Sequence, residues 1–299
     1  MTNITDRIGR KIRVCFRDSK GFRKELDSPA LTTALRLKTR LSRMTAATPG
    51  ADPAGGRLAQ KLHDKGIKKI LGLDPVTAEI QLWNGRGFLI GVPADIGNFL
   101  CDVNGIIKEN QYNFENFRNA VVADAGANIG LFSLYACARG AGKIYAFEPV
   151  RETYAILKSN IAANRLEKIV LAVNAALGAK QGAAKIKYCT RGEGSAMIAE
   201  GNAGVNVGLV YEAERKVKVL ALDDAIRRKV DLIKIDVEGY EGNVLLGAAD
   251  LIRKHKPVLS FSAYHRRTDK KTLPDIVRGL RKDYSITLNT FAEHDFYCE

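Results

Sequence analysis

Apolar and polar positions follow two different rhythms through the C-terminal two thirds of the chain. Short apolar runs, each long enough for one buried strand, recur along it: VVADAG, KIYAFEP, IVLAVNAALG, DLIKIDVEG and KPVLSFSAY. Between them lie stretches with helical periodicity and a polar face, which begin near Ile129, Arg151, Asp223 and Glu241. This alternation predicts a mostly parallel sheet with helices on both faces. The last segment, SITLNTFAEHDFYCE, predicts two further strands in a hairpin at the sheet edge.

The segments before this alternation have weaker patterns. Residues 1–44 are basic and predict helical segments, and residues 45–57 are rich in proline, glycine and alanine, as in a flexible connector. EIQLW and GFLIGV then flank an Asn-Gly-Arg-Gly turn, which predicts a β-hairpin within residues 77–92. A helical stretch around residues 95–110 follows.

These patterns predict three parts. We expect a basic helical extension with a linker over residues 1–57, a hairpin and helix over residues 58–118, and one α/β domain over residues 119–299. Residues 191–208 are rich in glycine and small side chains and interrupt the alternation. They predict either a loop over a ligand site or a tolerated surface insertion.

Composition excludes some classes of protein. Of the 299 residues, 46% are hydrophobic and 27% are charged, which argues against wholesale disorder and against a membrane bundle. No apolar run is long enough to span a bilayer, and the first residues lack the apolar core of a secretory signal. We therefore expect a cytoplasmic location, while the oligomeric state stays open.

The net charge of +14 is unevenly distributed, because residues 1–45 contain twelve Lys and Arg residues against four Asp and Glu residues. Such an arm could contact nucleic acid, an anionic membrane surface or an acidic polymer, or it could be a solvated basic helix. Aromatic residues do not interleave with the basic ones in a base-stacking pattern, which makes nucleic acid the weaker option.

The strongest chemical signal lies in VVADAGANIGLFSLYA, residues 121–136. An apolar strand ends at Asp124, and Gly126, Asn128 and Gly130 open an amphipathic helix. Glycines let the backbone turn sharply beside a ligand, and the N–H groups at a helix N-terminus bind a carboxylate or phosphate. This pattern predicts a nucleotide site.

The second strand narrows the choice of ligand. It ends in Glu148 and Pro149, where an acid can accept hydrogen bonds from ribose hydroxyls. Asn128 occupies the place of the middle glycine in a dinucleotide fingerprint, and Asp124 would repel a pyrophosphate. The same acid suits the ammonium group of an amino acid. The pattern therefore favours S-adenosylmethionine, which has an amino-acid end and an adenosine end.

Four motifs in order, DAGANIG, YAFEP, NAALG and IKIDVEGYE, resemble the FkbM-type family of class I S-adenosylmethionine-dependent methyltransferases. The resemblance covers about residues 119–265, and four motifs with conforming spacing rarely coincide. It implies an α/β fold with a doubly wound, mostly parallel seven-stranded Rossmann-like sheet and a reversed final hairpin. The cofactor-binding residues that it implies are Asp124, Gly126, Ala127, Asn128, Gly130, Glu148, Pro149, Asn174 and Ala175.

The motif IKIDVEGYE places acids at the carboxyl end of another strand. Ligands of open α/β sheets bind at that edge, so we expect Asp236 to face the reacting end of the cofactor. Glu238 is a candidate contact for the acceptor substrate. These acids could instead cap the next helix, and for Glu241 capping is the favoured interpretation.

Transfer of a methyl group to an alcohol requires a group that removes the hydroxyl proton. Asp236 is the first candidate base, and His265, which follows strand KPVLSFSAY, is the second; Ser262 is a further candidate acceptor contact. Relatives often carry an acid beside this histidine, but SFSAYH has none. His265 could instead be a surface residue at a helix start. No metal is predicted, although Asp236 and Glu238 could hold a divalent cation as an alternative.

The sequence thus predicts an S-adenosylmethionine-dependent O-methyltransferase that acts on a sugar, a glycan or a small-molecule natural product. An RNA methyltransferase that uses the basic arm and a non-catalytic nucleotide-binding module are the alternatives. The chain lacks the N/D-P-P-[FY] tetrapeptide of amino-directed nucleic-acid methylases. No motif identifies the acceptor.

Overall fold

The computed structural model describes residues 12–26, 75–93, 95–188, 196–198, 213–290 and 293–299. These residues fall into two units, which divide between Glu109 and Asn110. Among the helices of the described ranges, none combines the length and the apolarity needed to cross a bilayer.

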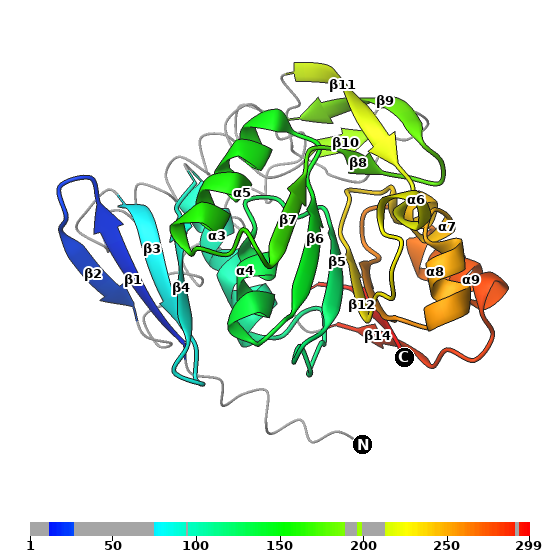
Figure 1. Ribbon diagram of the computed structural model, residues 1–299, viewed down its shortest axis with the longest axis horizontal. Coiled ribbons are helices and arrows are strands. Elements are labelled where there is room, and N and C mark those ends of the chain that lie inside the picture. Colours follow the sequence, from blue (N-terminus) through cyan, green and yellow to red (C-terminus); the bar gives the residue numbers. More distant parts are fainter. Residues whose placement is uncertain (1–11, 27–74, 94, 189–195, 199–212, 291–292) are drawn as a thin grey trace, which may run out of the picture. The chain divides into compact units, whose positions relative to one another are not determined.

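The described part of the first unit contains an antiparallel sheet (Figure 1). Its strands are β1 (Arg13–Asp18), β2 (Arg23–Leu26), β3 (Pro75–Gln81) and β4 (Gly87–Gly91), in the order β2-β1-β3-β4. β3 and β4 form the hairpin that the sequence predicts. The predicted helical stretch is present as α3 (Ile96–Asp102), continued by the π-helical segment η2 (Val103–Lys108).

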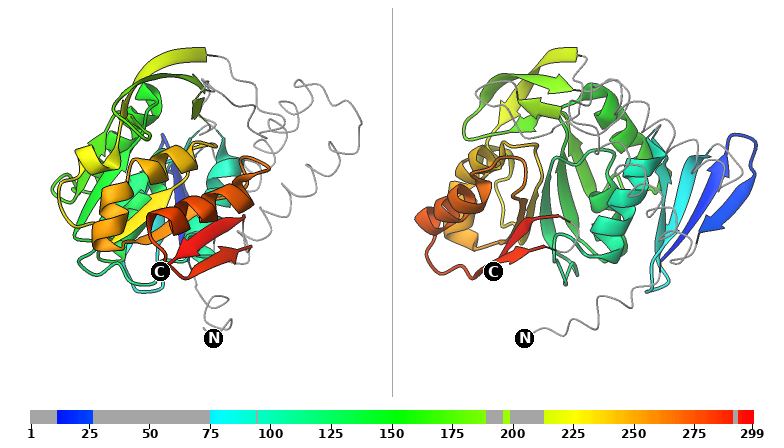
Figure 2. Two further views of the ribbon diagram at one scale, coloured as in Figure 1. Left: turned by 90° about the vertical axis from the view of Figure 1, so that its right-hand side faces the viewer. Right: turned by 180° about the vertical axis from the view of Figure 1, so that it is seen from behind.

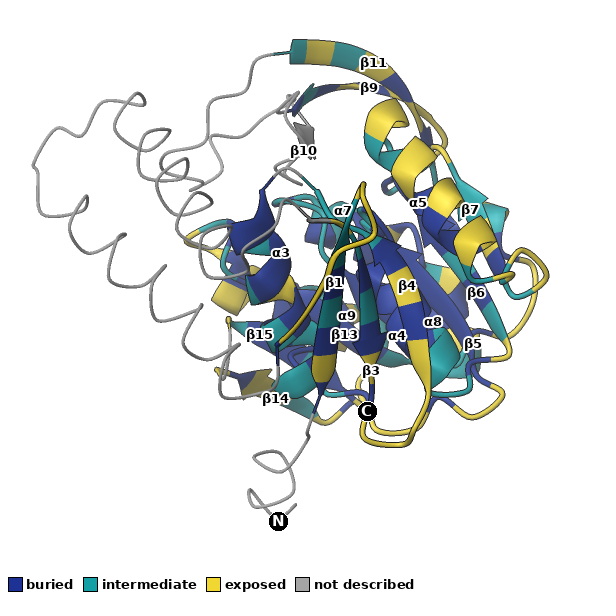
Figure 3. Ribbon diagram, turned by 90° about the vertical axis from the view of Figure 1, so that its left-hand side faces the viewer, coloured by how far each residue is buried: buried dark blue, intermediate teal, exposed yellow. Residues whose placement is uncertain are grey.

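The predicted N-terminal helical extension is wrong for the residues that the structure describes, because residues 12–26 form β1 and β2. Buried Val14 and Phe16 alternate with the more exposed Arg13, Cys15 and Arg17, which is the period of a strand and not of a helix. Phe16 packs edge to face on Phe99 of α3, with ring centroids 6.4 Å apart. Figure 3 shows the same alternation of buried and exposed positions along β4. The linker at residues 45–57 lies outside the described residues.

The predicted first and second parts also share one sheet, because β1 pairs with β3 along its whole length. Residues 13–18 of the predicted extension therefore belong to the same sheet as the hairpin that follows.

The second unit is built on a seven-stranded sheet in the order β14-β15-β13-β12-β5-β6-β7. Its strands are β5 (Val121–Ala125), β6 (Lys143–Phe147), β7 (Val170–Val173), β12 (Leu232–Ile235), β13 (Val258–Ser262), β14 (Ile286–Asn289) and β15 (Asp295–Cys298). Five neighbouring strands, β7, β6, β5, β12 and β13, run parallel, and β15 is antiparallel to both of its neighbours. The structure confirms the predicted sheet, and Figure 2 shows the final hairpin at its edge.

Helices cover both faces of this sheet (Figure 1). α4 (Leu131–Ala138) and α5 (Arg151–Ala163) lie on one face, and α7 (Glu241–Leu246), α8 (Ala249–His255) and α9 (Asp269–Leu280) lie on the other. The chain runs outward from β5 through β6 to β7 and then returns to β12 on the other side of β5. Such a reversal creates a crevice at the carboxyl ends of the two central strands, where open α/β sheets bind ligands.

A smaller sheet in this unit was not predicted. It contains β8 (Ala176–Leu177), β9 (Gly182–Tyr188), β10 (Ala196–Ile198) and β11 (Ala213–Leu220), in the order β10-β9-β11-β8, and the short α6 (Leu222–Ala225) follows it. The apolar run IVLAVNAALG divides at Asn174, so that its first half is β7 and its second half is β8. Of the predicted loop at residues 191–208, only β10 lies within the described residues.

The outer positions of β9 and β11 carry an unbalanced positive charge. Lys185 lies directly opposite Lys216, whereas Lys187 lies opposite Glu214 and forms an ion pair with it at 3.4 Å. Like charges directly opposite each other destabilise a pair of strands. The inner positions, which include Ile186, are apolar and buried, and they hold the two strands together.

Candidate active site

A tight turn follows β5 at the centre of the sheet. Gly126, Asn128 and Gly130 all have positive φ angles, of 76°, 51° and 96°. A Cβ atom on Gly126 would lie 1.8 Å from the backbone oxygen of Asp236. Only glycine fits there, because the turn after β5 contacts the backbone at the end of β12.

Asp124 lies in β5, directly before this turn, and is fully buried. Its Oδ2 accepts a hydrogen bond of 2.7 Å from the Ser133 hydroxyl of α4, and its Oδ1 lies 3.3 Å from the ammonium of Lys234. Asp124 therefore links β5, α4 and β12 from within. Its predicted contact with a ligand ammonium stays a prediction.

The sequence analysis did not single out Lys234, yet this residue connects the turn after β5 to β12. Its Nζ donates a 2.7 Å hydrogen bond to the carbonyl of Gly126 and lies 5.3 Å from the ring centroid of Tyr112. Burial acts to lower the pKa of Lys234, but the charges of Asp124 and Asp236 outweigh it and raise that pKa. A lysine within the apolar run LIKI was the available signal, since buried lysines require partners.

Glu148 ends β6 beside the turn. Its Oε2 accepts from the N–H of Asn128 at 3.0 Å, and its Oε1 accepts from the N–H of Val150 at 2.8 Å. Burial raises the pKa of Glu148 to about 7. Each carboxylate oxygen keeps acceptor capacity for a further donor.

The other residues predicted to hold the cofactor gather around Glu148. The Asn174 amide donates to the carbonyls of Glu148 and Pro149 at 2.8 and 3.1 Å, so it fixes the end of β6. Ala175 is buried directly after it, and Ala127 donates its N–H to the Phe147 carbonyl at 2.9 Å. The structure thus brings the predicted cofactor residues to one edge of the sheet.

Asp236 follows β12 on the other side of the crevice, and its side chain is partly exposed. Tyr112, which the sequence analysis missed, donates its hydroxyl to Oδ2 of Asp236 at 2.9 Å. Burial acts to raise the pKa of Asp236, but the charges of Lys234 and His265 and the hydrogen bond from Tyr112 lower it. Asp236 is therefore a stable carboxylate.

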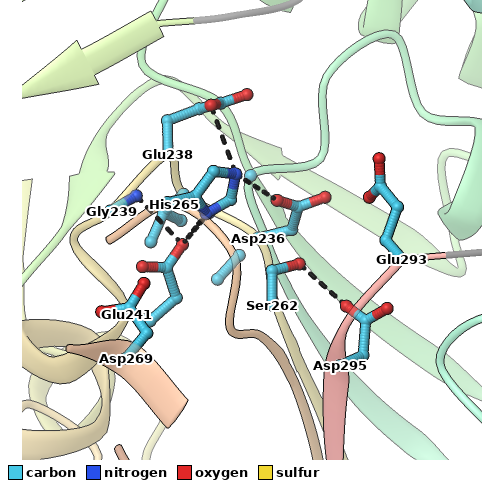
Figure 4. Close-up of polar contacts among 12 residues, drawn as sticks. Asp236, Glu238, Gly239, Glu241, Ser262, His265, Asp269, Glu293 and Asp295 are labelled. Atoms are coloured by element: carbon cyan, nitrogen blue, oxygen red, sulfur yellow. Dashed lines mark hydrogen bonds and ion pairs between the residues drawn. The ribbon is translucent and has the colours of Figure 1, made fainter. Parts of the chain in front are cut away.

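Three carboxylates surround the buried His265 (Figure 4). Its Nδ1 lies 2.8 Å from Glu241, and its Nε2 lies 3.3 Å from Glu238 and 3.7 Å from Asp236. Burial acts to lower the pKa of His265, but these carboxylates raise it to about 10. The alternative that His265 is a surface residue is wrong, because it is only 2% exposed.

Glu241 does not cap the helix that it begins, which corrects the favoured interpretation. Its Oε1 accepts hydrogen bonds from the N–H groups of Val237 and Gly239, at 3.2 and 3.1 Å, as well as contacting His265. The carboxylate therefore closes the turn before α7 and orients the imidazole.

Donor atoms of Asp236, Glu241 and His265 lie within 4.8 Å of one another, as a shared metal ion would require. However, Glu241 and Nδ1 of His265 already satisfy each other at 2.8 Å. The geometry therefore favours an ion-paired cluster. Glu238, the other acid of the metal alternative, faces Nε2 of the same ring.

The final hairpin adds acids that the sequence analysis missed. The hydroxyl of Ser262, at the end of β13, donates to Oδ1 of Asp295 at 3.0 Å, and both side chains are buried. Burial and the charge of Asp236 raise the pKa of Asp295 to about 7. Glu293 lies nearby and accepts a hydrogen bond from Gln111 at 3.1 Å. This edge of the sheet is thus rich in carboxyl groups.

Comparison with known proteins agrees with this arrangement. A family model described as methyltransferase FkbM domain matches residues 124–296. The chain belongs to the FkbM methyltransferase family. The segment that matches the FkbM domain begins at Asp124 and includes Asp295, so it spans every predicted site residue.

One relative of this FkbM-family chain is methyltransferase sdnD from Sordaria araneosa. It is 31% identical over 173 residues, which are 48% of this chain and 66% of that protein. The crystal structure of methyltransferase FkbM from Methylobacillus flagellatus KT is similar with a TM-score of 0.47 and 20% identity, over 70% of this chain and 56% of its own. Precorrin-6y C5,15-methyltransferase from Geobacter metallireducens GS-15 has a TM-score of 0.39 and 14% identity, over 71% of this chain and 90% of its own.

Proposed function

We propose that this FkbM-family chain transfers a methyl group from S-adenosylmethionine to a hydroxyl of a sugar, a glycan or a small-molecule natural product. The observation that carries the proposal is the arrangement around the ends of β5 and β12. Glu148, an acid placed to bind ribose hydroxyls, lies on one side, and a cluster of carboxyl groups lies on the other. A negative edge favours a donor whose reacting sulfur is positively charged.

The residues at the crevice fit such a cofactor. Glu148 keeps acceptor capacity for the ribose hydroxyls, and the first N–H groups of α4 have no carbonyl within the helix to bond, which suits a carboxylate. Asn174 and Ala175 would border the adenine. When bound, S-adenosylmethionine supplies a methyl group on a positively charged sulfur.

Asp236 is the residue that we assign to the acceptor. A carboxylate at the end of β12 can accept a hydrogen bond from the acceptor hydroxyl and so hold its oxygen in line with the methyl group. As the new oxygen–carbon bond forms and the sulfur–carbon bond breaks, the hydroxyl proton passes to Asp236. His265 is the poorer base at neutral pH, since a group with a pKa of about 10 already carries its proton.

Several hydrogen-bonding groups around Asp236 suit a polyhydroxylated acceptor. Glu238 and Glu293 offer carboxylate oxygens, and the Gln111 amide has a second N–H besides the one that it donates to Glu293, which suits the donors and acceptors of a polyol. The proposal that the acceptor carries several hydroxyl groups rests on this match and on the O-methylation that the sequence predicts.

Calorimetry tests the cofactor. We expect S-adenosylmethionine and its demethylated product to bind, and Glu148→Gln to weaken binding at least tenfold, because the neutral amide loses charge-assisted hydrogen bonds to ribose. Glu167→Gln changes an exposed glutamate and is the matched control. No heat with either compound, combined with binding of a nicotinamide dinucleotide, would contradict the proposal.

Labelled S-adenosylmethionine tests the acceptor. The label should appear in a monosaccharide, a glycan or a small polyhydroxylated compound when fractionated host extract is supplied. Label found in RNA would instead favour the alternative acceptor, and label found in no fraction despite cofactor binding would favour a non-catalytic module.

A further inference from the structure

One buried carboxyl group near the reaction centre has no role in the steps described so far. Asp295 is 1% exposed, and its Oδ2 is buried without a hydrogen-bond partner in the described part of the chain. An unpaired buried oxygen is unfavourable, and such oxygens are rare in folded proteins. Asp295 therefore requires an explanation.

Ser262 connects Asp295 to Asp236. Its hydroxyl donates to Oδ1 of Asp295 at 3.0 Å and also helps to lower the pKa of the nearby Asp236. Figure 4 shows the Ser262 side chain between the two carboxyl groups. A hydroxyl that donates to one carboxylate still has lone pairs that can accept a proton from the other.

We propose that Asp236, Ser262 and Asp295 form a proton relay that carries the acceptor's hydroxyl proton away from the reacting oxygen. Asp236 takes the proton as the methyl group is transferred. It passes a proton to the Ser262 oxygen, while Ser262 gives its own hydrogen to Oδ1 of Asp295. Asp295 releases a proton to solvent when the product leaves, so each group returns to its starting state. This inference deepens the proposed function and rests on it.

The environments of the two carboxyl groups give the relay its direction. Lys234 and His265 stabilise the ionised form of Asp236, whereas Asp295 faces the negative charges of Asp236 and Glu293. The pKa of Asp236 is accordingly lowered, and burial together with the charge of Asp236 raises the pKa of Asp295 to about 7. A proton moves favourably from the first group to the second.

The other groups that face Asp295 are consistent with this role. Burial, together with the charges of Asp236 and Asp295, raises the pKa of Tyr112 well above its ordinary value. Gln111 bonds to Glu293 and carries no charge. Burial also raises the pKa of Glu293, but Asp295 is the carboxyl group that accepts the hydrogen bond from Ser262.

Infrared titration of the chain without acceptor tests the relay directly. A protonated buried carboxyl group gives a distinct carbonyl band, which we expect to titrate near pH 7 and to disappear in Asp295→Asn. The band of Glu148, whose pKa is also about 7, is assigned separately with Glu148→Gln. The absence of any band that depends on Asp295 between pH 5 and 9 would overturn the proposal.

Steady-state kinetics also test the relay. The acceptor is whichever compound in a panel of monosaccharides and polyols is methylated fastest. At saturating cofactor, kcat should rise with pH through an apparent pKa near 7, because Asp295 must be ionised to accept a proton. Asp295→Asn and Ser262→Ala should lower kcat about ten- to a hundredfold and remove this pH dependence, with cofactor affinity unchanged.

Ser260→Ala is the matched control, because Ser260 is an equally buried serine two residues earlier on β13. It should retain both the rate and the pH profile. Unchanged kcat and an unchanged profile in Asp295→Asn would reject the relay even if methyl transfer occurs, whereas failure of the cofactor to bind would reject the proposed function itself.

Discussion

At the scale of single residues, His265 shows how the surroundings of a side chain change its chemistry. A histidine after a strand suggests a base, but three carboxylates make this one a permanent cation near neutral pH. Its charge then stabilises the ionised form of Asp236, the residue that we propose as the base. The two candidate bases thus differ in charge, because Glu241 and Glu238 stabilise the protonated form of His265.

The raised pKa of His265 predicts a pH dependence of stability. The folded chain holds this proton more tightly than the unfolded chain, so the stabilisation is complete below pH 6.5 and is lost as the pH rises to about 10. Within that window, the free energy of unfolding should fall with pH with a slope that approaches about 1.4 kcal/mol per pH unit, and His265→Gln should remove this contribution. Urea unfolding at several pH values measures it, with His255→Gln on α8 as the control. Parallel stability curves for wild type and His265→Gln would contradict the assignment.

At the scale of elements, the contact between the ends of β5 and β12 builds the crevice. The turn at Gly126 lies against the backbone oxygen of Asp236, and Lys234 bonds to the carbonyl of Gly126. The turn after β5 and the end of β12 are therefore held together by backbone contacts as well as by side chains.

Gly126→Ala should destabilise the chain by about 3 kcal/mol or more, since it introduces a clash with the backbone and a strained positive φ. The control is Gly182→Ala at the start of β9, where a Cβ atom meets nothing within 4 Å. Thermal or urea unfolding of both variants measures the difference. If Gly126→Ala were as stable as Gly182→Ala, the described contact would be wrong.

The sequence predicts some elements better than others for physical reasons. β5 and β12 are buried on both faces, so their runs VVADA and LIKI are nearly continuous in apolar residues. β1, β9 and β11 expose one face that carries lysine and arginine, and their short alternation resembles a basic helix or a loop. The split between β7 and β8 depends on the side chain of Asn174, which a hydropathy pattern does not record.

At the scale of the whole second unit, the candidate site is assembled from segments far apart in the chain. The glycine turn, Glu148 and Asp236 were predictable because each ends a recognisable strand. Tyr112 and Asp295 were not, because they come from the segment before the domain motifs and from the last hairpin. Only the fold places them beside Asp236.

Charge is also separated at this scale. The chain has a net charge of +14, yet the crevice edge gathers Asp236, Glu238, Glu293 and Asp295. A cationic donor therefore meets a local potential opposite in sign to that of the chain as a whole.

The facing lysines of the smaller sheet have a consequence for how the chain responds to ionic strength. Lys185 and Lys216 repel each other, and dissolved ions screen that repulsion. Hydrogen exchange of the β9 and β11 amides should slow when sodium chloride is raised from low to physiological concentration, while β5 and β12 exchange at an unchanged rate. Equal responses in both sheets would show that the lysines are already neutralised. If the two sheets respond differently, the smaller sheet becomes more rigid as the ionic strength rises, whereas the seven-stranded sheet does not.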